Sequence, residues 1–349
     1  MLLATACGGD GERTITPPHA DTTRYRNPVL DADFPDPAIV RAADGTFYAY
    51  ATQTVRGGLV NIQVARSADL VRWALLGDAL PQRPAWSTRV WNFWAPHAVR
   101  DDARGRYVMY YAAHHDALDG KCIGIATSPA PRGPFADIGA PLVCAADGFN
   151  IDAMAFDDPV SGRRFLYWGS SDRQPLVVQE LAADGMSFAP GSAPRAVLAP
   201  GGDAEYSRLV EAPWVIHRAP WYYLFYSGDD CCGSPPHYAV LVARATDPAG
   251  PFQRLGEANG TGRSEILAGT GYWRAPGHNA VVADDAGADW IVYHAVDPAR
   301  PLQDEVSFVR RPMLIDRLRY HDGWPVVEGG EPSVDRVARP IIMGRAAAP

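Results

Sequence analysis

The sequence predicts an all-β protein, and within that class a five-bladed β-propeller, from three observations. Glycine and proline, with 33 and 31 residues, are spread along the 349-residue chain together with 10 tryptophans and 15 tyrosines, a composition typical of many short strands joined by turns. An aromatic strand recurs about every 60 residues, and a second aromatic landmark follows it at a similar period. Hydrophobic residues make up 47% of the chain, which is enough for a large packed core.

The first landmark is a turn containing Gly or Asp, followed by a short strand rich in Tyr, Phe and Trp. It reads GTFYAYAT, GRYVMYYAA, GRRFLYWGS, PWYYLFYSG and ADWIVYHAV along the chain. Its anchors are separated by 60, 58, 57 and 68 residues and are Phe47, Tyr107, Phe165, Tyr222 and Trp290. Five units of this length fill residues 24–345.

The second landmark is an apolar strand and a turn that ends in an aromatic residue. The aromatic residues are 62, 53 and 64 residues apart and are Trp73, Phe135, Phe188 and Phe252. A further apolar stretch precedes each anchor, so each unit holds three or four short strands, as a propeller blade does. Such a unit cannot bury both of its faces alone, and the repeats must therefore stack into a ring. The alternative is a non-repeating pair of β-sandwiches.

Charge excludes some classes of partner. The chain has 32 Lys and Arg against 40 Asp and Glu, a formal net charge of −8, and no basic stripe. Nothing here favours nucleic acid or an anionic membrane surface as a partner, and a neutral ligand fits better.

The first residues, MLLATACGGDGERTITPPHADTT, look like the end of a bacterial lipoprotein signal. In this interpretation Cys7 carries the lipid, residues 1–23 are a signal remnant and flexible tether, and residues 346–349 are a tail. The protein would then be exported, as a periplasmic or cell-surface lipoprotein. The alternative is a plain disordered N-terminus. No later stretch reaches the ~18 consecutive apolar residues that a membrane span needs.

Four further cysteines remain if Cys7 is an anchor. An exported protein could pair Cys122 with Cys144 and join the adjacent Cys231 and Cys232. The alternative is that all four are buried free thiols.

Polar residues lie at the start of the first strand of each unit, and in a propeller these positions converge on the central axis. Asp36, Asp152 and Glu211 lie 11, 13 and 11 residues before their anchors, and His278 lies 12 before its own. In the second unit the segment WAPH, with Trp94, occupies this place. We therefore expect three carboxylates, a histidine and a tryptophan at one end of the channel.

Carboxylates that face a narrow channel repel one another and raise one another's pKa, which favours a chemical role. A protonated acid and an ionised base on opposite faces of a sugar suit glycoside hydrolysis, and a third carboxylate can keep the pKa of the acid high. Trp94 would supply an apolar floor for a sugar ring. His278 could ligate a metal, hold a water near the axis, or be a hydrogen-bonded core histidine.

Taken together, these segments resemble glycoside hydrolase family 43, whose members are five-bladed propeller enzymes. The resemblance rests on FPDPAIV, NFWAPHAV, IDAMAF, VEAPWV and GHNAVV. It implies an inverting mechanism with Asp36 as the general base, Glu211 as the general acid and Asp152 as the residue that tunes and orients the acid. It also implies an ion, often calcium, held through water near His278.

Two positions depart from the family pattern. Ala212 follows the acid where the family commonly has Gly, and Ala153 follows Asp152 where it commonly has Pro. The segments SGDDCCGSPPHYAVLVARATDPAGPF and RPMLIDRLRYHDGWPVVEGG look most like the arabinan-active branch. We therefore expect an α-L-arabinofuranosidase or arabinanase that binds arabinose-containing oligo- or polysaccharides. The alternatives are a β-xylosidase of the same family and a non-catalytic oligosaccharide-binding propeller.

We expect the substrate to contact Trp94, Phe34, Trp91 and Asn150. The segments PAWSTRVWNFW and DDCCGSPPH are the candidate walls of the cleft, and loops at residues 80–92, 114–121 and 229–237 would open or close one of its ends. Trp86 and Phe93 would be either further stacking platforms or ordinary packing aromatics.

Overall fold

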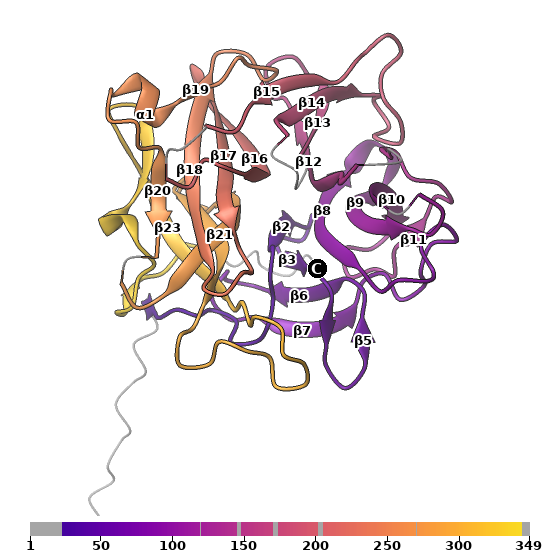
Figure 1. Ribbon diagram of the computed structural model, residues 1–349, viewed down its shortest axis with the longest axis horizontal. Helices are drawn as coiled ribbons and strands as arrows, with labels where there is room; N and C mark the ends of the chain where they lie inside the picture. Colours follow the sequence, from indigo (N-terminus) through magenta and orange to yellow (C-terminus); the bar gives the residue numbers. More distant parts are fainter. Residues whose placement is uncertain are drawn as a thin grey trace, which may run out of the picture.

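Five antiparallel sheets surround a central axis in the computed structural model (Figure 1), so the predicted five-bladed propeller is confirmed. The structure describes residues 23–343 except 119, 145–147, 170–173, 202–204 and 270. The predicted lipid site at Cys7 and the predicted tail at residues 346–349 lie outside the described residues. Within the described part, none of the helices is both long and apolar enough to cross a membrane.

Each blade has four strands in chain order, with a fifth strand added in blade 4, and the strand nearest the axis comes first. Blade 1 contains β2 (Ala38–Arg41), β3 (Phe47–Ala51), β6 (Gln63–Ser67) and β7 (Ala74–Asp78). Blade 2 contains β8 (Phe93–Asp101), β9 (Arg106–His115), β10 (Gly120–Ser128) and β11 (Ala136–Asp137). Blade 3 contains β12 (Ile151–Asp157), β13 (Arg164–Gly169), β14 (Leu176–Leu181) and β15 (Arg195–Leu198).

Blade 4 contains β16 (Val210–Arg218), β17 (Trp221–Asp230), β18 (His237–Ala245) and β19 (Gln253–Arg254), and β20 (Glu265–Ala268) also pairs with β18. Blade 5 contains β21 (Arg274–Ala283), β22 (Asp289–Val296), β23 (Met313–His321) and β24 (Trp324–Val327). A small hairpin, β4 (Thr54–Val55) with β5 (Leu59–Val60), projects from blade 1. The helical segments are α1 (Leu255–Ala258), η1 (Asp102–Arg104) and η2 (Glu328–Gly330).

The aromatic anchors explain the repeat. Each one lies at the first or second position of the second strand of its blade and is at least 93% buried. In this position the aromatic side chain packs into the apolar layer between neighbouring blades, where three clusters of buried side chains form the core. The first strands β2, β8, β12, β16 and β21 contact one another in ring order around the axis.

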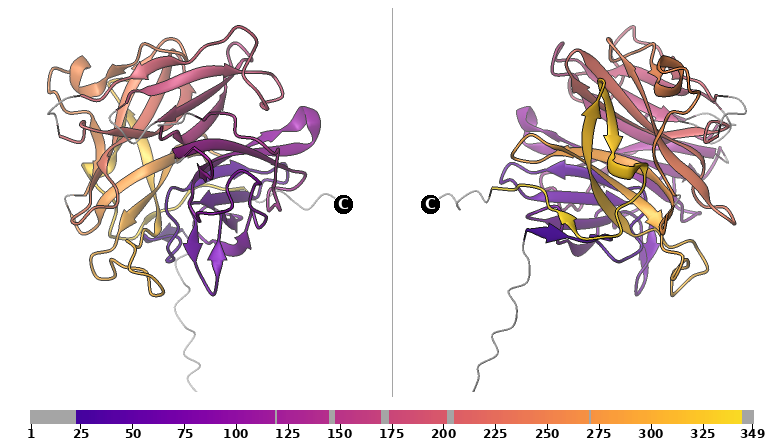
Figure 2. Two further views of the ribbon diagram at one scale, coloured as in Figure 1. Left: turned by 45° about the vertical axis from the view of Figure 1, so that its right-hand side comes forward. Right: turned by 90° about the vertical axis from the view of Figure 1, so that its left-hand side faces the viewer.

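The ring is closed by the two ends of the described chain. β1 (Arg24–Tyr25) pairs with β25 (Val337–Ala338), and Figure 2 shows this indigo strand beside the yellow C-terminal segment. The next residues follow the edge of β23, where the Leu30 N–H donates to the Met313 carbonyl at 3.3 Å. The N-terminal segment thereby joins blade 1 to blade 5.

Candidate active site

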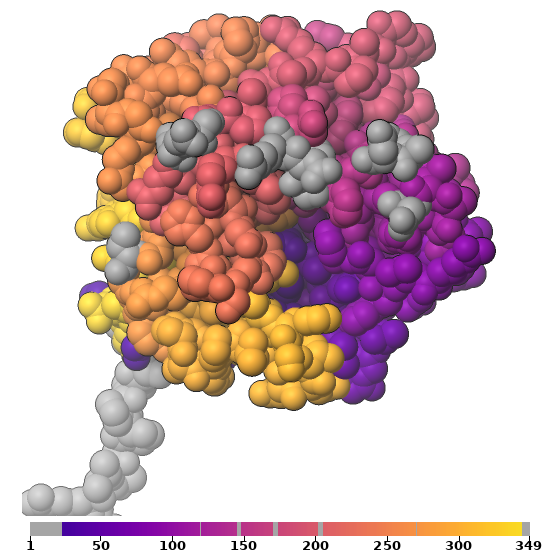
Figure 3. Space-filling view, in the orientation of Figure 1, coloured from indigo at the N-terminus to yellow at the C-terminus, as the bar shows by residue number. Residues whose placement is uncertain are grey.

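A cavity of about 830 Å³ opens where the first strands of the blades begin. Figure 3 shows a hollow at the centre of this face, with the indigo and purple residues of blade 1 on its floor. The cavity is lined by Asp36, Trp94, Asp152, Glu211 and His278. The structure therefore brings together the five residues expected at the mouth of the channel.

The first strands share a strained backbone feature at this mouth. A non-glycine residue has a positive φ in each blade, namely 58° at Asp36, 43° at Ala95, 59° at Asp152, 55° at Ala212 and 46° at Ala275. In β8, β12, β16 and β21 the pairing with the second strand shifts register at this point, as in a β-bulge. The left-handed conformation costs a side-chain-bearing residue about 1 kcal/mol or more, and such bulges re-aim side chains beside functional sites.

The three carboxylates were expected at equivalent positions of their blades, and the positive-φ residues show that only two of them are equivalent. Asp36 and Asp152 occupy the positive-φ position itself, whereas Glu211 precedes it and matches the place of Trp94 in blade 2. Ala212 takes the conformation that glycine adopts without strain, so the departure from the family pattern preserves the turn of the backbone at the acid.

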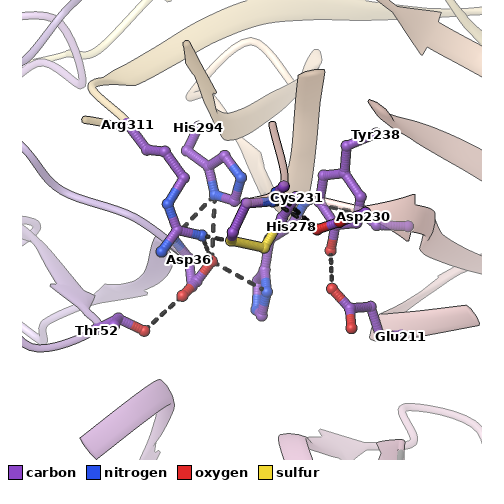
Figure 4. Close-up of a disulfide and its surroundings, with 12 residues drawn as sticks. Asp36, Thr52, Glu211, Asp230, Cys231, Tyr238, His278, His294 and Arg311 are labelled. Carbon is purple, nitrogen blue, oxygen red and sulfur yellow. Dashed lines mark hydrogen bonds and ion pairs between the residues drawn. A yellow bond between two sulfur atoms is a disulfide. The ribbon is translucent and has the colours of Figure 1, made fainter. Parts of the chain in front are cut away.

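Asp36 is surrounded by donors and basic groups (Figure 4). The Thr52 hydroxyl donates to Oδ2 at 2.5 Å, and Arg311 Nη1 donates to Oδ1 at 3.1 Å. Nδ1 of His278 and Nδ1 of His294 lie 3.4 and 3.2 Å from the same Oδ1. The Asp36 N–H also donates to His294 Nδ1 at 3.1 Å, so this nitrogen presents its lone pair to the backbone.

These groups keep the Asp36 carboxyl ionised. Burial alone would raise its pKa, but the Arg311 guanidinium and then the two imidazoles hold the pKa of Asp36 well below its usual value. Burial lowers the pKa of His278, and it lowers the pKa of His294 to about 4. Near neutral pH, Asp36 is therefore a carboxylate that can accept a proton.

Glu211 has the opposite electrostatic character. Burial raises the pKa of Glu211 to about 7, the hydrogen bond from Tyr238 opposes this rise, and the charge of Asp36 adds to it. The Tyr238 hydroxyl donates to Glu211 Oε1 at 2.5 Å. Gly277 makes this approach possible, because a Cβ there would lie 2.0 Å from the Tyr238 ring. Glu211 can therefore hold a proton under mildly acidic conditions.

Asp152 is coupled to Glu211 through the backbone and through charge. Its Oδ2 accepts the N–H of Ala212 at 3.0 Å, next to the acid. Burial, and then the charge of Glu211, raise the pKa of Asp152 well above its usual value. Two carboxyl groups that repel each other in this way retain a shared proton to higher pH than either would alone.

Trp94 lies over a buried lysine. Lys121 Nζ is 3.1 Å from the centroid of the Trp94 ring and donates to the Asn92 carbonyl at 3.0 Å. Burial lowers the pKa of Lys121 to about 6, and the charge of Asp152 opposes this. The Lys121 amino group thus contacts one face of the Trp94 ring. Trp94 lines the cavity together with Trp91.

Two predicted substrate contacts do not reach the cavity. Phe34 is fully buried in the hydrophobic core, so its prediction as a substrate contact is corrected. Asn150 does not line the cavity either, and its Nδ2 donates to the Lys121 carbonyl at 3.3 Å. Each lies two places before a carboxylate, where a regular strand would put both side chains on one face, but the positive φ at Asp36 and at Asp152 breaks this alternation.

Trp86 and Phe93 are packing aromatics. Trp86 stacks on Tyr111, with ring centroids 6.1 Å apart, and Phe93 is fully buried. Of the two alternatives left open by the sequence, the structural role is the one observed.

Several residues that shape the site were not predicted from the sequence. They are Thr52, Lys121, Tyr238, His294 and Arg311. Thr52 and His294 end or interrupt the aromatic runs GTFYAYAT and ADWIVYHAV, and this could have identified them. Tyr238 is the second residue of a third strand, and Arg311 lies in a long loop, and no landmark repeats at either place.

The walls of the cavity were predicted in part. Residues 229–237 supply Cys231 and Cys232, and residues 80–92 supply Trp91 and Asn92. No described residue of 114–121 lines the cavity. Two walls were missed, namely the β4–β5 hairpin with Leu59 and the loop between β22 and β23, whose lining residues include Phe308.

Both predicted disulfides are present. Cys122 is joined to Cys144, and Cys231 is joined to its neighbour Cys232. The alternative of four free thiols is therefore excluded.

The side chains near His278 do not by themselves form a calcium site. The described residues contain no group of three or more His, Cys, Asp or Glu side chains that could hold a metal ion. Calcium takes about six to eight oxygen ligands, whereas His278 offers nitrogen and Asp36 Oδ1 is already bonded to the Arg311 cation. Calcium held through water near His278 stays a prediction.

The arrangement is suited to acid and base chemistry on a neutral ligand. One cavity contains a carboxylate that is kept ionised and a carboxyl group that keeps its proton to about pH 7. Titratable groups whose pKa values are driven apart in this way are typical of an acid and base pair.

Comparison with known proteins gives a family match over most of the chain. The model of "Glycosyl hydrolases family 43" matches residues 25–325. The chain is 29% identical to arabinan endo-1,5-alpha-L-arabinosidase C of Emericella nidulans, over 82% of this chain and 89% of that protein. It is 24% identical to the extracellular exo-alpha-(1->5)-L-arabinofuranosidase ArbA of Cellvibrio japonicus, over 86% and 87% of the two chains.

Two further similarities bear on fold and substrate. A thermostable family-43 glycoside hydrolase of known structure has a TM-score of 0.75 and 26% identity, over 91% of this chain and 99% of that chain. A xylan 1,3-beta-xylosidase of a Vibrio species is 24% identical over 92% of this chain, which spans 60% of that protein.

Proposed function

Because the chain belongs to glycosyl hydrolases family 43, we propose that it is an inverting hydrolase of α-L-arabinofuranosyl linkages in arabinan or arabinose-containing hemicellulose. The observation that carries the proposal is the opposite pKa shift of two carboxyl groups in one cavity, downward at Asp36 and upward to about 7 at Glu211.

In the proposed reaction, Glu211 donates its proton to the glycosidic oxygen as the bond from this oxygen to the anomeric carbon breaks. Asp36 accepts a proton from a water molecule, whose oxygen attacks the anomeric carbon from the opposite face and inverts its configuration. Asp152 shares a proton with the acid, because the two carboxyl groups repel each other when both are ionised, and it orients the acid through the Ala212 N–H. Proton exchange with solvent then restores both groups.

The choice of substrate is supported by the relatives named above for arabinan and arabinofuranosides. The relative named as a xylosidase supports β-xylosidase activity as the second candidate. Membership of a glycoside hydrolase family disfavours a propeller that only binds oligosaccharides. We further propose secretion, because relatives are described as extracellular. Anchoring through a lipid on Cys7 stays a prediction.

A product profile on linear and branched arabinan, with the anomer of the first product detected by NMR, tests the substrate, the cleavage mode and the inversion together. We expect arabinose or arabino-oligosaccharides with inverted configuration. Release of xylose from xylo-oligosaccharides alone would favour the second candidate, and a retained anomer would contradict the role of Asp36.

Glu211→Ala tests the acid. We expect kcat to fall about 10³-fold on unactivated substrates, because proton transfer to the leaving oxygen is lost. Glu328→Ala is the matched control, because the Glu328 side chain is 85% exposed and remote from the cavity. Full activity in Glu211→Ala, with an intact fold, would overturn the assignment.

A further inference from the structure

The disulfide between Cys231 and Cys232 is a part of the cavity wall that acid and base catalysis leaves unused. It lies in the turn between β17 and β18, and both cysteines line the cavity that contains Asp36 and Glu211. Cys232 is exposed and Cys231 is half-buried. A disulfide that only stabilised the fold would not need to face this cavity.

The disulfide is connected to the base through Arg311. Arg311 Nη1 lies 3.7 Å from Cys231 Sγ and 3.1 Å from Asp36 Oδ1. In Figure 4 the two sulfur atoms lie between the group around Asp36 and the pair formed by Tyr238 and Glu211.

The same turn is connected to the acid. Asp230, immediately before the disulfide, accepts the N–H groups of Cys232 and Gly233 on Oδ1, each at 2.9 Å. The turn ends at the start of β18, where Tyr238 donates to Glu211 at 2.5 Å. The disulfide therefore contacts the arginine beside the base, and its turn leads into the strand whose Tyr238 contacts the acid.

The chemistry of a disulfide defines what it can contact. Its sulfur atoms have no proton to donate, accept hydrogen bonds weakly and are polarisable, so they favour apolar contacts over hydroxyl groups. The C–H face of a sugar ring has this character. The bond between adjacent residues also closes a small ring, so little conformational freedom remains to be lost on binding.

We propose that the Cys231–Cys232 disulfide contacts the C–H face of the glycosyl residue held between Asp36 and Glu211, and thereby positions that residue. The inference rests on the proposed function, and its ligand class is an arabinofuranosyl oligosaccharide. The disulfide takes no part in proton transfer and acts through the position of the sugar.

The double variant Cys231→Ser and Cys232→Ser tests this contact. We expect KM for arabino-oligosaccharides to rise about tenfold and kcat to change less than twofold, because a contact made equally in the ground state and the transition state is lost. Ser234→Ala, an exposed residue of the same turn that does not line the cavity, should leave both constants unchanged. Melting temperatures of the variants report whether the fold is retained.

A binding measurement separates this inference from the proposed function. The Kd of arabinohexaose is measured by calorimetry for Glu211→Gln, with and without the two cysteine changes, so that no turnover is required. A tenfold weaker Kd with the cysteine changes supports the contact even if the wild-type protein releases no arabinose. Kd and KM values within twofold of those with the intact disulfide would overturn the contact, whatever the activity of the wild-type protein.

Discussion

Asp36 and Glu211 have the same functional group, and their neighbours decide their different protonation. Arg311 and two imidazoles hold the pKa of Asp36 well below its usual value against the effect of burial. Among the residues that the structure describes, no cation lies in hydrogen-bond contact with Glu211, and burial raises the pKa of Glu211 to about 7. Activity should therefore persist at low pH, where Asp36 stays ionised, and should fall as the pH rises above about 7, where Glu211 loses its proton.

Tyr238→Phe tests the pH at which activity falls, which is the alkaline limb of the pH-rate profile. The Tyr238 hydroxyl donates to Glu211 Oε1 and lowers the pKa of Glu211, because the hydrogen bond favours the ionised form. Removing the hydroxyl should raise the pKa of Glu211, so the alkaline limb of kcat/KM should move to higher pH by about one unit. A pH-rate profile of the two proteins measures the shift.

The matched control for this change is Tyr293→Phe. Tyr293 also donates to a carboxylate, Asp316 Oδ2 at 2.6 Å, but Asp316 does not line the cavity, whereas Glu211 does. The alkaline limb of the pH-rate profile should not move in Tyr293→Phe. A limb that is unmoved, or that shifts to lower pH, in Tyr238→Phe would show that Glu211 is not the group titrating there.

The three carboxylates could be predicted from the sequence because each lies at a countable distance from an aromatic anchor. Arg311 could not be predicted in this way, since it lies in the loop of residues 297–312, which is longer than the corresponding connection in the other blades. The low pKa of Asp36 depends on this arginine, so the sequence predicted the positions of the carboxylates better than their protonation.

At the scale of elements, the anchors predicted the second strand of every blade, because one buried aromatic residue is needed there for each blade interface. The bulges in the first strands were not predicted. Asp36 and Asp152 tolerate a positive φ better than most residues, but Ala95, Ala212 and Ala275 have no such preference. Their conformation is imposed by the ring, in which five strand ends converge on one axis.

Ring closure involves the buried side chain of Asn27 as well as the two-residue strand β1. Asn27 is 6% exposed, its Nδ2 donates to the Ile315 carbonyl at 3.0 Å, and its Oδ1 accepts the Ile315 N–H at 3.0 Å. Asn27→Ala should destabilise the protein by about 2 kcal/mol, because the buried Ile315 N–H loses its acceptor, whereas the Ile315 carbonyl keeps the Tyr25 hydroxyl. The melting temperature should fall by about 4 °C.

Val160→Ala provides the baseline for that measurement, because Val160 is 68% exposed in a turn of blade 3. It should leave the melting temperature within about 1 °C of the wild-type value. An equally small change in Asn27→Ala would mean that the hydrogen-bonding groups at the edge of β23 find partners without the Asn27 side chain.

At the scale of the whole molecule, the catalytic centre comes from the inner strands, and the outer cleft comes from loops that differ between blades. The β4–β5 hairpin brings Leu59 to the cavity, and the loop of residues 297–312 brings Phe308, which are 56% and 60% exposed. Exposed apolar groups on a cleft wall are suited to the apolar faces of further sugar residues. The repeat could not predict these walls, because they interrupt it.

Phe308→Ala should therefore affect long substrates selectively. If Phe308 contacts a sugar residue beyond the one held between Asp36 and Glu211, its loss should raise KM for arabinohexaose about fivefold, which corresponds to about 1 kcal/mol. KM for nitrophenyl arabinofuranoside should stay unchanged, since this substrate occupies only the centre. Leu302→Ala is the matched control, because Leu302 is 50% exposed on the same loop and does not line the cavity. Equal effects of Phe308→Ala on both substrates would place Phe308 at the catalytic centre.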